Sequence, residues 1–207
     1  MEKIYTRLVV SGLIGPLVYA LILSILAILE PNYNPITQSM SELGATDAQY
    51  AFLTNLLGFP LLGIFLICFT IGIHKLLPAG RISILAPCLL IISSVSLILT
   101  GVFRCDPGCI DITLNGKLHS LFASLAAIFM MPVPIAIMPR IYKKENWYNY
   151  IWFGLVTMLL TSILSLFYVF PSFANLTGLL QRLSMGVPFF WVMIISIKLF
   201  RIQSPQS

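Results

Sequence analysis

The segment Glu30–Tyr50 has the sequence EPNYNPITQSMSELGATDAQY and separates two long apolar runs. It contains three acidic residues and no lysine or arginine, although the whole chain of 207 residues has a net charge of +5. Lysine and arginine collect in the cytoplasmic loops of membrane proteins, so an acidic connection between two membrane-length runs is typical of the opposite side. This segment therefore indicates both the class of the protein and the side on which the loop lies.

The composition excludes a water-soluble fold. Charged residues make up 9% of the chain and apolar residues 58%, with a mean hydropathy of +0.96. A soluble domain carries about a quarter charged residues. The basic residues stand singly at the ends of apolar runs and form no patch interleaved with aromatic residues, so we expect membrane lipids and no nucleic acid as partners.

Six apolar runs are long enough to cross a bilayer as helices. We therefore predict an all-α integral membrane protein that forms one transmembrane bundle over residues 1–207. Lys3 and Arg7 precede the first run as they would in a signal peptide, but the run lacks a cleavage site, so we interpret it as a retained anchor. The predicted spans are about 8–29, 50–73, 82–103, 117–138, 149–170 and 177–199.

The distribution of cations predicts that both termini are cytoplasmic. The first, third and fifth connections hold only Arg104, Lys117 and Arg182, together with most of the acidic residues. Under the positive-inside rule these three connections face outward. The other nine cations lie at the termini and in the even connections: Lys3, Arg7, Lys75, Arg81, Arg140, Lys143, Lys144, Lys198 and Arg201.

A candidate site lies at the outward face, where the odd connections bring ionisable residues to one level. The predicted catalytic residues are His119, Asp106, Glu42 and Ser41. His119 would act as general base toward a serine or water, oriented by one of the two carboxylates. The predicted substrate-binding residues are Arg182, Arg104 and Asn55, and the arginines would bind a phosphate group.

Each of these residues also has a structural interpretation that the sequence leaves open. Arg182 either extends to lipid phosphates or pairs with an acid, because ionisable groups inside spans are costly. His119 is either a catalyst or a packed, hydrogen-bonded side chain. Ser39–Glu42 and Thr46–Gln49 both match the capping-box pattern, which predicts a short surface helix and then the start of the second span.

Small and hydroxylated residues form one-sided stripes in two spans. At helical spacing, the third span has Ser93, Ser96, Thr100 and Arg104, and the fifth has Gly154, Thr157, Thr161, Ser165 and Tyr168. These stripes either line a polar cavity or let neighbouring helices approach and hydrogen-bond. The sequence does not decide between the two interpretations.

Two cysteines lie in the third connection. Cys105 and Cys109 enclose Asp-Pro-Gly, a turn tight enough for a disulfide on the oxidising side of the membrane. The spacing differs from the redox CxxC pattern. A zinc site of these cysteines with His119 lacks a fourth ligand, so we predict no metal and no cofactor.

Two stretches carry a family resemblance. The first is YNPITQSMSELG at Tyr33–Gly44, followed by Asn55, and the second is GVFRCDP at Gly101–Pro107, followed by TLNGKLH at Thr113–His119. With them the chain resembles the multi-pass bacterial and archaeal membrane family catalogued as domain of unknown function 998. The resemblance implies about six spans, a prokaryotic plasma membrane and no known activity. It marks these polar positions: Ser41, Glu42, Gly44, Asn55, Asp106, Gly116 and His119.

Three kinds of function remain open at this stage. The first is an outward-facing enzyme that binds and hydrolyses or transfers a lipid or lipid-linked substrate. The second is a transporter or small-molecule binding protein, and the third is a structural or accessory membrane subunit. The sequence does not indicate the oligomeric state.

Overall fold

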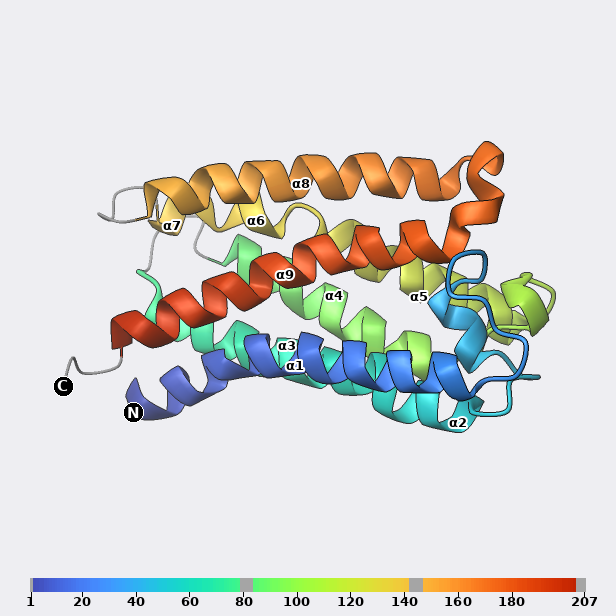
Figure 1. Cartoon of the computed structure of the whole chain (residues 1–207). Helices are drawn as coiled ribbons and strands as arrows, with labels where there is room; N and C mark the ends of the chain where they lie inside the picture. Colours follow the sequence, from blue (N-terminus) through green and yellow to red (C-terminus); the bar gives the residue numbers. More distant parts are fainter. Residues whose placement is uncertain (1, 79–83, 142–146, 204–207) are drawn as a thin grey trace.

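The computed structural model describes residues 2–78, 84–141 and 147–203, and the regular secondary structure of this described part is all helical (Figure 1). Six helical segments are long and apolar enough to cross a membrane. Arg81, Lys143 and Lys144, which contributed to the predicted orientation, lie outside the described residues. The six segments are built from α1 (Glu2–Leu29), α2 (Ala51–Leu53) with η2 (Thr54–Gly58) and α3 (Phe59–Leu76), α4 (Leu85–Val102), α5 (Leu114–Met130) with α6 (Val133–Ala136) and α7 (Met138–Ile141), α8 (Tyr148–Val169), and α9 (Thr177–Gln203).

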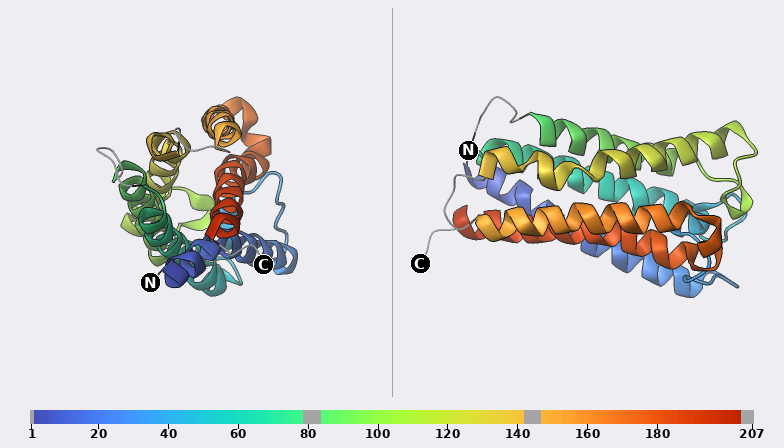
Figure 2. Two further views of the ribbon diagram at one scale, coloured as in Figure 1. Left: turned by 90° about the vertical axis from the view of Figure 1, so that its left-hand side faces the viewer. Right: turned by 90° about the horizontal axis from the view of Figure 1, so that it is seen from above.

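The helices form a ring when the bundle is viewed along its long axis (Figure 2). α1 packs against both α3 and α9, α3 packs against α4, and α4 against α5. α8 packs mainly on α9 and also contacts α6, which completes the ring. In lipid a helix satisfies its own backbone groups, so association depends on close packing of side chains.

Close backbone approach between α3 and α4 depends on a glycine. A Cβ atom at Gly63 would lie 2.6 Å from the carbonyl oxygen of Ser94. Hydroxyl groups add bonds between helices: Ser93 Oγ donates to the carbonyl of Ala126 at 2.8 Å, and Ser196 Oγ donates to that of Val9 at 2.6 Å. The polar stripe of the third span thus includes a hydrogen bond between two helices, as expected if the stripe serves helix packing.

Within the described residues, one span is interrupted at its prolines. α5 ends at Met130, and Pro132 lies between it and α6, whose first turn contains Pro134; proline lacks the N–H that an inner helical turn needs. Pro16 and Pro188 lie inside continuous helices. Pro60 follows η2, a π-helical turn that shifts the register of the second span.

The two ends of the bundle differ in charge. We call the end formed by residues 30–50, 103–113 and 170–176 the acidic end, and the end with both termini the basic end (Figure 1). Three short helices lie at the acidic end: η1 (Met40–Gly44), η3 (Pro107–Cys109) and η4 (Pro171–Leu176). At the basic end the buried Arg140 donates to the carbonyls of His74 and Leu77, where α3 ends.

Candidate functional site

The first connection is fastened to α9 by Arg182. Its Nη1 donates to the carbonyl oxygens of Pro35 at 2.7 Å and Gln38 at 3.3 Å, and its Nη2 donates to the phenol oxygen of Tyr33 at 2.6 Å. The guanidinium also lies 5.7 Å from the centre of the Tyr33 ring. Arg182 therefore binds main-chain carbonyls and a phenol, and within the described residues it forms no ion pair with an acid.

Glu42 stabilises the start of η1. One carboxylate oxygen accepts the N–H of Ser39 at 2.7 Å, and the other accepts the side-chain amide of Gln38 at 3.0 Å. This is the glutamate half of the predicted capping box. The Ser39 side chain faces the backbone of Glu42, which completes the predicted capping box, although its buried hydroxyl makes no full hydrogen bond in the described structure.

The start of the second span corrects the other capping prediction. The helix begins at Ala51 rather than near Thr46. Glu30 holds the two residues directly before the helix, because its two carboxylate oxygens accept the N–H groups of Gln49 at 2.9 Å and Tyr50 at 3.1 Å. The N–H of Thr46 instead donates to the carbonyl of Cys105 at 3.1 Å, which joins the first and third connections.

Asn55 connects η1 to the second span. Its Nδ2 donates to the carbonyls of Gly44 at 2.7 Å and Ala51 at 2.8 Å. The π-helical turn at Thr54–Gly58 includes this residue, and such turns recur at functional sites. The Asn55 Oδ1 atom is buried and has no partner in the described part of the chain.

Asp106 organises the third connection. Its carboxylate accepts the N–H groups of Thr113 at 2.7 Å and Ile112 at 2.9 Å, and the hydroxyl of Thr113 at 2.7 Å. The Thr113 backbone and hydroxyl bonds, together with the Ile112 bond, lower the pKa of Asp106. Thr113 also caps α5 by accepting the N–H of Gly116 at 3.2 Å.

His119 is buried, with 2% of its surface exposed, and its two ring nitrogens have different surroundings. Its Nδ1 lies 2.9 Å from the carbonyl oxygen of Thr100 and 2.8 Å from that of Phe103. Carbonyl oxygens only accept, so Nδ1 carries a proton. In a neutral ring Nε2 is then a bare acceptor, and it has no partner in the described residues. We expected a carboxylate to orient the His119 ring, but two main-chain carbonyls do so in the structure.

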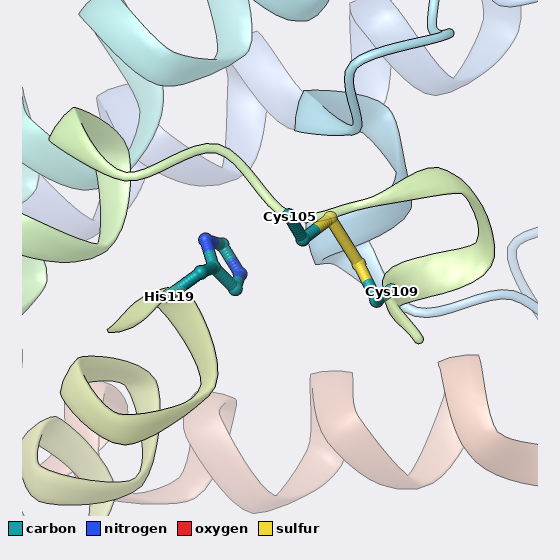
Figure 3. Close-up of side chains that lie close together, drawn as sticks. All are labelled: Cys105, Cys109 and His119. Atoms are coloured by element: carbon teal, nitrogen blue, oxygen red, sulfur yellow. A yellow bond between two sulfur atoms is a disulfide. The ribbon is translucent and has the colours of Figure 1, made fainter. Parts of the chain in front are cut away.

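The disulfide between Cys105 and Cys109 lies beside this ring (Figure 3). The sulfur atoms and a ring nitrogen of His119 lie within 4.8 Å of one another. The ring edge with Nε2 faces the disulfide (Figure 3). Cys105 Sγ also lies 3.2 Å from the carbonyl oxygen of Ser41, so η1 is adjacent to the same group.

A pocket of about 490 Å³ opens at this end of the bundle. Asp106 and Thr113 contribute polar atoms to its wall. Both carboxylate oxygens of Asp106 already accept hydrogen bonds from the protein, so Asp106 can accept few further hydrogen bonds from a ligand. The other lining residues are Thr46, Pro107, Ile112, Leu114 and Asn115.

The structure brings most of the predicted site residues together at the acidic end of the bundle, where hydrogen bonds join the loops. Arg104 is the exception, because its side chain is exposed and has no polar partner among the described residues. Several residues that form hydrogen bonds at this end were not predicted from the sequence. Of these, Thr113 alone could have been found, because a threonine directly before a helix is typical of an N-cap. The unpredicted residues are Glu30, Tyr33, Thr113 and Gln181, and the Oε1 atom of Gln181 accepts the Met40 N–H at 2.5 Å.

These observations define a six-helix membrane protein with a polar, hydrogen-bonded cap at one end of the bundle. A family model described as "Protein of unknown function (DUF998)" matches residues 13–198, and the chain belongs to that family. Comparisons with curated proteins and with solved structures found no match.

Proposed function

We propose that the acidic end faces outward from a prokaryotic plasma membrane and binds a lipid or lipid-linked substrate for hydrolysis or group transfer. The charge distribution supports the orientation, because the described cations Lys3, Arg7, Lys75 and Lys198 lie at the opposite end. Lys198 lies 5.1 Å from the ring centre of Tyr150, beside Trp147, in an aromatic and cationic belt typical of an interface. The prokaryotic membrane follows from the family resemblance.

The observation that carries the proposal is the free Nε2 of His119. An imidazole that donates from Nδ1 and whose buried Nε2 has no partner among the described residues offers the free acceptor that a general base needs. The nucleophile would be water or the Ser41 hydroxyl. Proton transfer from it to Nε2 leaves an imidazolium whose Nδ1–H is already held by the Thr100 and Phe103 carbonyls.

The remaining site residues take different roles from those first expected. Asp106 and Glu42 are positioning residues, since their carboxylates hold the loops around His119. Arg104 is exposed at the level of lipid headgroups and is the cation available to bind a phosphate. Arg182 donates to carbonyl oxygens of the first connection and so holds that loop in place.

The two histidines of the chain provide a matched test. His119 and His74 lie at opposite ends, and each has a buried ring nitrogen without a partner in the described structure. Purified protein in nanodiscs of bacterial lipid extract, supplemented with lipid-linked sugars and phosphates, is incubated and analysed by mass spectrometry for products. We expect wild type and His74→Gln to form a product that His119→Gln does not form. Equal turnover by a folded His119→Gln protein, or no turnover of any lipid by wild type, would overturn the proposal.

A structural or accessory role is the second candidate. The observation in its favour is that the side chains of Glu42, Asp106 and Arg182 all form hydrogen bonds with the protein's own loops. This role predicts that His119→Gln and His74→Gln change only thermal stability, with no difference in bound or converted lipid.

A further inference from the structure

We propose that Cys105, Cys109 and His119 form a site for one thiophilic metal ion, Zn²⁺ or Cu⁺, when the disulfide is reduced. The inference goes beyond the lipid chemistry proposed above and does not depend on it. It also departs from the expectation from sequence, in which the spacing gave no recognised metal pattern.

The three side chains lie close enough together to become ligands of one ion after reduction. The two sulfur atoms and a ring nitrogen all lie within 4.8 Å of one another. In a tetrahedral zinc site, with bonds of 2.0 to 2.3 Å, neighbouring ligand atoms are roughly 3.3 to 3.8 Å apart. Reduction replaces the sulfur–sulfur bond by a non-bonded contact, which allows this spacing without moving the ends of the loop.

His119 already has the arrangement of a metal-binding histidine. Such a residue almost always donates its other ring N–H to a carboxylate or backbone carbonyl, which fixes the tautomer. Nδ1 of His119 does this with Thr100 and Phe103, at 2.9 and 2.8 Å. Nε2 is therefore the ligand atom. It is buried, lacks a partner in the described structure, and faces the two sulfur atoms (Figure 3).

The loop holds the cysteines in place by contacts other than the disulfide. Gly108 and Cys109 adopt positive φ angles of 64° and 51°, which turn the chain back on itself. The Cys105 carbonyl accepts the Thr46 N–H, and Asp106 is fixed to Thr113. The two thiols would therefore stay close together after reduction, as a preorganised site requires.

The donor set selects the class of metal. Thiolate ligands favour Zn²⁺ and Cu⁺ over Mg²⁺ or Ca²⁺, which prefer oxygen ligands. Two thiolates cancel the charge of a Zn²⁺ ion at this partly buried position. Three protein ligands leave a fourth position for water on zinc, whereas Cu⁺ accepts three ligands. Cys109 is less buried than Cys105 and marks the side from which an ion enters.

The redox step needs a two-electron reductant, which we take to be a dithiol. One thiolate of the dithiol attacks the Cys109 sulfur and releases the Cys105 thiolate, and its second thiol then displaces Cys109. The dithiol becomes a disulfide, and the two protein cysteines each gain one electron. Binding of the metal to the two cysteines then releases the protons that they hold as thiols.

The test measures metal uptake without any lipid substrate, so it can fail or succeed independently of the lipid activity. Purified protein is prepared oxidised, or reduced with a phosphine. It is then exposed without oxygen to Zn²⁺ or Cu⁺, desalted and analysed for metal by mass spectrometry. We expect about one ion per reduced chain and essentially none per oxidised chain. Co²⁺ in place of Zn²⁺ should give the absorption of a thiolate-bound tetrahedral ion.

Variants locate the site. Cys68 and Cys88 are not disulfide-bonded and serve as controls, so the Cys68→Ser/Cys88→Ser protein should bind metal like wild type after reduction. Cys105→Ser/Cys109→Ser should bind none, and His119→Gln should bind at least tenfold more weakly. Equal uptake by oxidised and reduced wild type would overturn the proposal even if the serine variant does not fold. Uptake abolished by the control substitutions would also overturn it.

Discussion

Gly116 lies so close to Asp106 that a Cβ atom on Gly116 would overlap the Asp106 carboxylate. We therefore expect Gly116→Ala to displace Asp106 from Thr113 and to destabilise the protein by about 1 to 3 kcal/mol, as overpacking does. Thermal unfolding in detergent measures the effect. Gly186→Ala is the control, because a Cβ atom there meets nothing within 4 Å. Equal melting temperatures for the two variants would contradict the tight packing of Gly116.

Asp106 should also make stability depend on pH. Its pKa is lowered by hydrogen bonds from Thr113 and Ile112, so the carboxylate stabilises the fold above the unfolded value near 3.8. That contribution is lost as pH falls through the folded pKa, which places the loss below about pH 4. We expect Asp106→Asn to be less stable than wild type at pH 7 and to lose less stability on acidification.

The control for this experiment is Asp47→Asn, because Asp47 is exposed on the same side of the bundle. Unfolding curves from pH 7 to about pH 3 should follow wild type for this variant. A wild-type curve that is no steeper in acid than that of Asp106→Asn would show that the Asp106 hydrogen bonds do not stabilise the fold.

The spans could be predicted from the sequence because bilayer thickness dictates the length of apolar runs. The predicted fifth span, 149–170, differs from α8 by one residue at each end. The π-helical turn at Thr54–Gly58 could not be predicted, since it has no signal in apolar periodicity. Nor could the break after Met130 be distinguished from the uninterrupted helices around Pro16 and Pro188, because neighbouring helices decide whether a proline ends a helix.

The end of the bundle at which these residues lie was predictable, whereas their contacts were not. Alternating connections necessarily bring Glu42, Asp106 and His119 to one end. Their partners depend on contacts between distant segments, as when Arg182 reaches Tyr33 across 149 positions of the chain. Local patterns were reliable only where the contact is local, as for the Glu42 carboxylate and the Ser39 N–H.

Arg182 should be a strong determinant of the first connection. Arg182→Gln removes charged donors from the carbonyls of Pro35 and Gln38, and each such bond contributes about 1.5 to 3 kcal/mol. We expect a loss of about 2 kcal/mol in unfolding free energy and faster proteolysis within residues 30–50. Arg104→Gln, at an exposed residue, should stay within about 0.5 kcal/mol of wild type. Equal proteolysis of both variants would mean that Arg182 does not hold this loop.

The orientation can be tested with two exposed lysines at opposite ends of the bundle. Lys117 lies at the acidic end and Lys75 at the basic end. In a background without Cys68 and Cys88, we expect Lys117→Cys to react in intact cells with a maleimide that cannot cross the membrane. Lys75→Cys should react only after the cells are permeabilised, because the basic end faces the cytoplasm under the positive-inside rule. The native pair Cys105 and Cys109 should remain unlabelled while its disulfide is intact. Labelling of Lys75→Cys alone in intact cells would reverse the orientation and place His119 on the cytoplasmic side, which would exclude a lipid substrate of the outer leaflet.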